Sequence, residues 1–324
     1  MNEKQVPKDI PNPFWVLVNK EVADHLRSWR YIILIAIIAL TCLGSLYTAL
    51  SSIRDAVTTE EVERAFVFLK LFTISDGTLP PFITFISFLG PLLGIALGFD
   101  AINTERNKGT LIRVLAQPVP RDYIINVKFV AGLIVSSILV IALGFLVIGL
   151  GILMIGIPPT PEEFLRILSF LLLSIVYIGF WLNLSILCSV RFRQPSTSAL
   201  AGIAVWLFFS LFYNMIVGIL VNARAADIAS TAEQLEQIQF MQMLQRLSPS
   251  HLFSEATTTL LLPSVRSLGP LTMEQLYGAI PSPLPLGQSL LLVWPQVTAL
   301  VAITMLCFAA SYVLFMRQEI RARQ

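Results

Sequence analysis

Long runs without a charged residue limit most strongly what this chain can fold into. About 20 apolar residues are needed to cross the hydrocarbon core of a bilayer, and six runs between charged residues approach or exceed that length. The composition agrees, because 13% of the 324 residues are charged, whereas a soluble domain carries about 25%. We therefore predict an all-α membrane protein whose six transmembrane helices lie within residues 31–50, 82–99, 129–157, 167–190, 198–221 and 286–316.

These runs divide the chain into four parts. They are an N-terminal part over residues 1–30, spans one to five over 31–221, a non-spanning region over 222–285, and the last span with the C-terminus over 286–324. The third and sixth runs exceed one straight crossing. Because Pro295 interrupts the sixth run, we expect a tilt, a kink or a re-entrant start there rather than a seventh span.

Lys and Arg residues are distributed unevenly between the two sides that six crossings create. Fifteen lie on the side that holds both termini and seven on the other, where twelve of the 20 acidic residues also lie. Since cytoplasmic loops are enriched in basic residues, we predict a multi-pass protein of the cell (plasma or inner) membrane with both termini in the cytoplasm. The net charge of +2 does not indicate nucleic acid as a partner.

The N-terminal part contains an amphipathic helical pattern. Asn12-Pro13 is typical of a helix start, and apolar residues then recur at spacings of three and four. We expect this helix to lie flat on the cytoplasmic surface and to contact membrane lipid, because tryptophan suits the headgroup level. The alternative is a helix that packs on a soluble partner. The apolar stripe consists of Trp15, Val18, Val22, Leu26 and Trp29.

Helices are also expected on the outer side. Thr58-x-x-Glu61 resembles a capping box that opens a short helix through residue 72. In the 222–285 region, a glutamine-rich helix stops at Ser248-Pro249, and Ser250 would cap a second helix over 251–262. Prolines then give a stiff approach to the last span. The region would form either a cap with re-entrant hairpins or a lid that packs only on its own spans.

Several kinds of chemistry are absent from the sequence. The six apolar runs contain no Asp, Glu, Lys, Arg or His, which argues against proton coupling but leaves sodium coupling through backbone carbonyls open. Neither a P-loop, an HExxH motif nor a GxSxG motif occurs, and the three cysteines lack CxxC spacing. We therefore expect no catalytic residue, no metal site and no cofactor in this chain, so that it is not an enzyme and any energy comes from another protein.

A glycine repeats every fourth residue along the second span, at Gly90, Gly94 and Gly98. Such a stripe lets another helix approach closely. We interpret it as helix packing within the subunit, with a conducting interface as the less favoured alternative.

The sequence after the second span predicts two short helices, with a break between them, over residues 104–116. Gly109 would cap one helix, since glycine adopts the left-handed conformation without strain. Residues 110–116 would then form a short amphipathic turn that places Leu111 and Leu115 on one face and Arg113 elsewhere. Such a short rigid helix would suit the reception of force from a cytoplasmic partner. From these residues alone, an ordinary charged loop is equally consistent.

This loop resembles the signature loop of the type-2 ABC-transporter permeases (the ABC-2 type), especially the branch that includes the permease for maturation of the nitrous oxide reductase copper site. The matching residues are Asp100, Ile102, Glu105, Arg106, Gly109, Thr110, Leu111, Leu115, Pro118, Val119, Arg121 and Lys128. The resemblance implies that 104–116 contains the coupling helix, with Glu105 and Arg106 as its charged contact pair. The ATPase-coupling set is Glu105, Arg106, Gly109, Thr110, Leu111 and Arg113. The N-terminal helix resembles the connecting helix of that family.

By this resemblance, the chain would be the permease subunit of an ABC exporter that moves a hydrophobic or amphipathic substrate. It would pair with a second permease subunit, as a homodimer, and with two copies of an ABC ATPase subunit that holds the ATP and magnesium. The 222–285 region looks longer than in compact family members. One alternative is therefore a subunit that transmits force to an extracytoplasmic protein without moving cargo. Another is an ATP-independent channel or carrier.

Overall fold

The computed structural model describes residues 12–56, 66–116, 120–224, 231–264 and 283–318, and every regular element within them is a helix. Six helical segments are long and apolar enough to cross a membrane, which confirms the prediction of an all-α protein with six spans. The helices are α1 (Pro13–Leu26), α2 (Trp29–Ala56), α3 (Val67–Thr73), α4 (Phe82–Gly98), α5 (Asn103–Asn107), α6 (Thr110–Leu115), α7 (Arg121–Ile155), α8 (Pro161–Arg191), α9 (Pro195–Leu207), η2 (Phe208–Phe212), α10 (Tyr213–Arg224), α11 (Thr231–Gln245), α12 (Pro249–Leu261) and α14 (Leu286–Arg317).

Helix α8 is the centre of the bundle and contacts α4, α7, α12 and α14. A capping box at its start, in which Thr160 and Glu163 bond each other's backbone amides, fixes where the helix begins. Its length then carries large buried side chains, among them Tyr177 and Trp181. Within a bilayer, spans associate through close packing and hydrogen bonds rather than through removal of apolar surface from water, so the tightly packed side chains of α8 provide the surface on which the other spans assemble.

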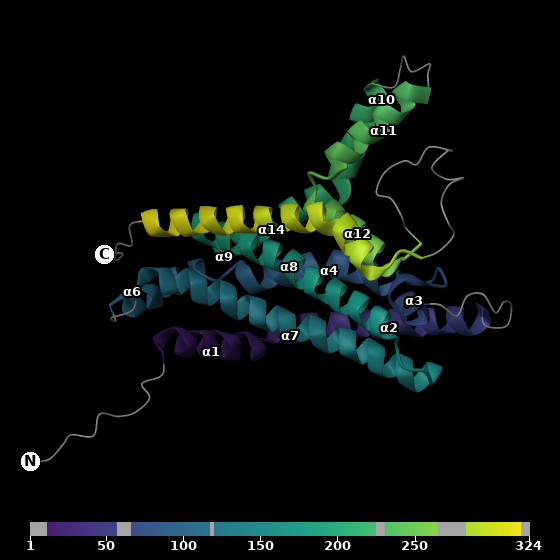
Figure 1. Cartoon of the computed structure of the whole chain (residues 1–324). Coiled ribbons are helices and arrows are strands. Elements are labelled where there is room, and N and C mark those ends of the chain that lie inside the picture. Colours follow the sequence, from purple (N-terminus) through teal and green to yellow (C-terminus); the bar gives the residue numbers. More distant parts are fainter. Residues whose placement is uncertain (1–11, 57–65, 117–119, 225–230, 265–282, 319–324) are drawn as a thin grey trace, which may run out of the picture.

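Both ends of the described chain lie at the same end of the bundle, which we call the terminal end (Figure 1). Helices α5 and α6 lie there too, and α1 packs along the start of α7. Val18 of α1 is buried against Val127 and Ala131 of α7. A predicted feature is corrected here, because α1 ends at Leu26 and Trp29 is the first residue of α2. The break at 27–28 removes Trp29 from the connecting helix.

The fifth span is interrupted by the π-helical turn η2. Beyond it, α10 and α11 run together away from the other helices (Figure 1). A π-helical turn contains one residue more than an α-helical turn, and this extra residue bends the helix and changes its direction. Apolar side chains of α10 are consequently exposed, including Met215 and Ile219.

Helix α12 packs on the spans of its own chain, against α8 and α14. Its position differs from the prediction in detail, since Ser248 precedes its first residue while Ser250 lies inside the helix. The Ser250 hydroxyl meets the Tyr177 hydroxyl at 3.1 Å, and the Phe253 ring stacks on Tyr177 at 4.2 Å. The last span is one continuous helix, α14, that contains Pro295. The predicted capping box at 58–61 lies outside the described residues.

The glycine stripe joins α4 to α8. A methyl group at Gly94 would lie 2.7 Å from the Ile178 carbonyl oxygen, and one at Gly98 would lie 2.8 Å from the Leu182 carbonyl oxygen. At Gly90 the nearest atom would be a side-chain carbon of Ile178 at 3.1 Å. The structure thus places all three glycines in packing within the chain.

Candidate coupling site

The connection between α4 and α7 is a broken helix, as the sequence predicts. Helix α4 ends at Gly98, α5 and α6 follow, and between them Gly109 adopts a positive φ of 69°. This conformation is strained for other residues, so Gly109 is what lets α6 leave the axis of α5.

The start of the connection is attached to α8. The Ser189 hydroxyl accepts hydrogen bonds from the backbone amides of Ile102 and Asn103, at 2.9 and 3.2 Å. Further along, the Asn107 side-chain amide donates to the Arg193 carbonyl at 2.9 Å. Two points on α8 and the loop after it therefore position α5.

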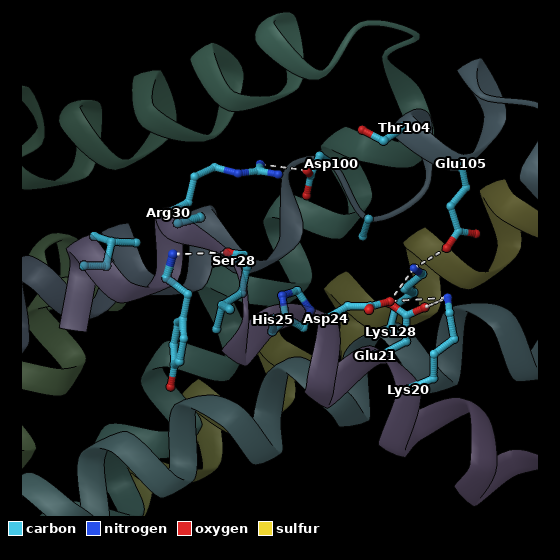
Figure 2. A pocket seen from close by; sticks show the side chains of 15 residues that line it. Lys20, Glu21, Asp24, His25, Ser28, Arg30, Asp100, Thr104, Glu105 and Lys128 are labelled. Atoms are coloured by element: carbon cyan, nitrogen blue, oxygen red, sulfur yellow. Dashed lines mark hydrogen bonds and ion pairs between the residues drawn. The ribbon is translucent and has the colours of Figure 1, made fainter.

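Glu105 points into the protein rather than toward a partner. Its carboxylate accepts a 2.5 Å bond from the ammonium of Lys128 on α7, and the same ammonium donates to Glu21 of α1 at 2.6 Å. Figure 2 shows the three side chains converging. The sequence analysis did not detect this pairing. It placed Glu105 among the residues that contact the ATPase. An amphipathic pattern shows which face is polar, but not which distant charge that face meets.

A charged cavity of about 180 Å³ lies beside this cluster (Figure 2). Its wall includes Arg30, whose guanidinium bonds Asp100 at 2.7 Å, as well as Lys20 and Asp24 of α1. Tyr31 and Leu97 belong to its apolar part. The cavity lies where α1, α2 and α4 meet, and its Arg30–Asp100 ion pair joins the start of α2 to the segment that follows α4.

Burial and charge oppose each other at Glu21. Burial alone would raise its pKa, but the adjacent ammonium of Lys128, helped by Lys20, more than offsets that effect and holds the pKa below the usual value. Burial also lowers the pKa of His25, so the imidazole is favoured in its neutral form. At neutral pH, Glu21 is therefore the charged partner of Lys128.

The exposed side chains of this connection lie mainly on α6 and the turn before it. Lys108 and Arg113 are exposed, and Ile112 is 39% exposed. Arg106 is half-buried and has no ion-pair partner in the described ranges. Leu111 is only 1% exposed, so within the predicted coupling set it packs inside the protein and does not form part of the exposed surface. Sequence reasoning missed Lys108 and Ile112, although both lie next to predicted contact residues.

On the connecting helix, the predicted stripe divides into two parts. Val18 is buried and Val22 is half-buried, whereas Trp15 and Leu26 are 53% and 44% exposed. The inner residues attach α1 to α7, and the exposed ones leave an apolar surface. That surface agrees with the predicted contact with lipid, and no described element covers it.

At the opposite end of the bundle, Arg166 joins three elements. Its guanidinium is fully buried and donates to the carbonyls of Leu260 and Leu284, to the Ser289 hydroxyl, and to the Glu162 carboxylate at 2.9 Å. The sequence showed Arg166 only as a charge at the edge of a span, because its partners on α12, on α14 and before α14 lie 94 to 123 residues away.

A second polar cluster lies among the spans. Glu255 of α12 accepts hydrogen bonds from Arg246 at 2.8 Å and from Gln296 of α14 at 3.1 Å. Gln296 is ten residues into α14, about 15 Å along its axis. The six apolar runs lack ionisable residues, but α12 brings a carboxylate alongside them. The sequence reading assigned this carboxylate to the outer region.

Comparison with known proteins agrees with this architecture. Residues 15–320 match the ABC-2 family transporter protein family. The probable ABC transporter permease protein NosY of Pseudomonas aeruginosa is 29% identical over 210 residues, which are 62% of this chain and 68% of that protein. The protein of the same name in Stutzerimonas stutzeri is 24% identical over 208 residues, which are 64% of this chain and 70% of that protein. With six spanning helices and a family match over nearly its whole length, this chain belongs to the ABC-2 family and is a permease subunit of an ABC transporter.

Proposed function

We propose that this permease docks an ABC ATPase on the exposed surface of α6 and the turn before it, and that ATP hydrolysis there drives export. The observation that carries the proposal is the exposure of Lys108, Ile112 and Arg113 on a segment attached firmly to α8. A docking surface needs accessible side chains on a support that moves as one body. The terminal end is then cytoplasmic, as the excess of Lys and Arg there supports.

The proposed assembly is two permease subunits, as a homodimer, with two ATPase subunits that hold the ATP and magnesium. An apolar or amphipathic cargo suits a pathway along the second and fifth spans, whose side chains are largely apolar.

A second candidate function is force transmission to an extracytoplasmic protein. It is favoured by α12, which is tied to the central helix α8 through the Tyr177–Ser250 contact and to α14 through Glu255 and Gln296. Movement of α8 would therefore reach the non-spanning region directly. Reconstituted vesicles distinguish the two functions. ATP use that depends on an added extracytoplasmic protein, without movement of lipid or amphipathic dye, favours force transmission.

Reversing the charge of Arg113 should lower recovery of the ATPase. In membranes that contain both proteins, Arg113→Glu is expected to reduce the ATPase captured with tagged permease about tenfold, because one unfavourable interfacial contact of that strength costs about 1.4 kcal/mol. Arg106→Glu should act in the same direction.

Arg317→Glu is the matched control, since it makes the same charge change on another exposed site at the terminal end. Its capture of ATPase should equal that of the wild type. Equal capture by all the variants would contradict docking at α6, and recovery of wild-type permease with no P-loop ATPase would refute the proposed function.

A further inference from the structure

The contact between α1, α5 and α7 depends on a single ammonium group. The Lys128 side chain is 10% exposed, and the carboxylates that it joins, Glu21 and Glu105, are 11% and 20% exposed. Partial burial excludes much of the water that would otherwise screen these charges. The three residues belong to three different helices (Figure 2), so the ion pairs connect α1, α5 and α7 to one another.

The chemistry of lysine suits this position. An ammonium has three donors and no acceptor, so it can hold one carboxylate on each side at once. Without it, Glu21 and Glu105 would face each other as like charges at short range, which is unfavourable. Lys128 is therefore needed for α1 and α5 to approach.

Within the described residues, helix α5 itself makes few polar contacts, while Ile102 before it and Leu111 after it are buried in the core. It has five residues, and besides its contacts with α6 the described structure ties it to α8 through Ser189 and to the next loop through Asn107. By contrast, α1 already packs on α7 through buried apolar side chains such as Val18. Among the ion pairs of the described residues, the Lys128–Glu105 contact links α5 to that pair.

We propose that Lys128 is the positioning residue that transmits displacement of the coupling segment, α5 and α6, to the connecting helix α1 and the third span α7 together. This inference rests on the proposed function, because the displacement comes from the ATPase. A push on α6 would reach α8 through Ser189 and would reach α7 and α1 through Lys128. The contact through Ser189 and the contact through Lys128 would then move α8, α7 and α1 together.

The experiment uses the whole permease–ATPase complex in lipid nanodiscs. Spin labels are placed at Leu153 and Leu291, which are 80% and 78% exposed near the opposite end of α7 and α14. The native cysteines are replaced by alanine, and labelled permease is diluted with unlabelled permease. The distance distribution is measured without nucleotide and after trapping with ATP and vanadate.

In the wild type, trapping should move the labels to a new distance. Lys128→Met should reduce the population at the new distance about tenfold, a typical size for the loss of coupling between sites, while ATPase binding stays unchanged. Lys20→Met is the matched control, because Lys20 also pairs with Glu21 but is 59% exposed, and both of its ion pairs in the described structure lie within α1. It should keep the wild-type shift. Lys128→Arg should retain most of the shift.

A triple variant tests whether the link itself matters. Lys128→Met with Glu21→Gln and Glu105→Gln leaves no unpaired charge, so it avoids the misfolding that the single variant risks. It should bind the ATPase and hydrolyse ATP, but it should not show the shift. A wild-type shift in this variant or in Lys128→Met would overturn the proposal.

Loss of ATPase binding in the triple variant would also overturn it, because the cluster of Glu21, Glu105 and Lys128 would then support the docking surface instead. These results differ from failure of the proposed function, in which the wild-type permease binds no ATPase. Wild-type complex that binds the ATPase but shows no nucleotide-dependent shift would overturn both.

Discussion

Substituting Gly94 by alanine should lower the melting temperature of the detergent-purified permease by several degrees. The added methyl group would lie 2.7 Å from the Ile178 carbonyl oxygen and 2.8 Å from the Leu182 amide nitrogen. Both are backbone atoms of α8, so no rotamer change can make room, and the two helices must separate. Overpacking of this kind costs about 1–3 kcal/mol, which for a chain of this size shifts the melting temperature by roughly 2–4 °C per kcal/mol.

Two other glycine substitutions provide comparisons for the loss of stability expected at Gly94. Gly90→Ala should cost less, because its new methyl group would meet a movable side-chain carbon of Ile178 at 3.1 Å. Gly149→Ala is the control, since no atom lies within 4 Å of the new group, and alanine also favours the helix by up to about 1 kcal/mol. Melting is followed by intrinsic tryptophan fluorescence. Equal losses at the three positions would show that the close approach of α4 and α8 does not limit stability.

The glycine stripe illustrates what the sequence could predict. A repeat of small residues indicates a close helix neighbour, and the structure supplies the neighbour, α8 of the same chain. The spans themselves were predictable because hydrocarbon imposes one simple requirement, a long run without charge. The turn at Gly109 was predictable for a similar reason, since a positive φ is a local property of the backbone.

The site was less predictable, because its geometry depends on partners far along the chain. Glu105 reads as a surface charge in sequence, yet it pairs with Lys128 and through it with Glu21. Likewise, apolar periodicity continues through Trp29, but the helix stops at 26 and restarts at 29. A regular spacing cannot show such a break. The structure has the short helices α5 and α6 where the family resemblance placed the coupling segment, and the role of that segment in docking stays a prediction.

Arg166 is the residue outside the coupling site whose loss should have the largest effect. Arg166→Met is expected to destabilise the protein by about 3–5 kcal/mol, the range for removing one member of a buried charged network. The substitution leaves the buried Leu260 carbonyl and the Ser289 hydroxyl without their donor. It also removes the hydrogen bond that holds the Leu284 carbonyl, just before α14. Because α12 depends on these contacts, its amides should exchange hydrogen faster than those of α1.

Two variants separate the ion pair from the carbonyl contacts. Glu162→Gln removes the paired charge but keeps the guanidinium, and since Glu162 is 39% exposed the cost should stay below about 1 kcal/mol. Arg166→Lys keeps the charge, but a single ammonium cannot reproduce the branched geometry that reaches Leu260 and Leu284 together, so it should resemble Arg166→Met. If Glu162→Gln were as damaging as Arg166→Met, the ion pair would dominate. Arg166 would then hold α8 to its own first turn rather than hold α12 and α14 to the bundle.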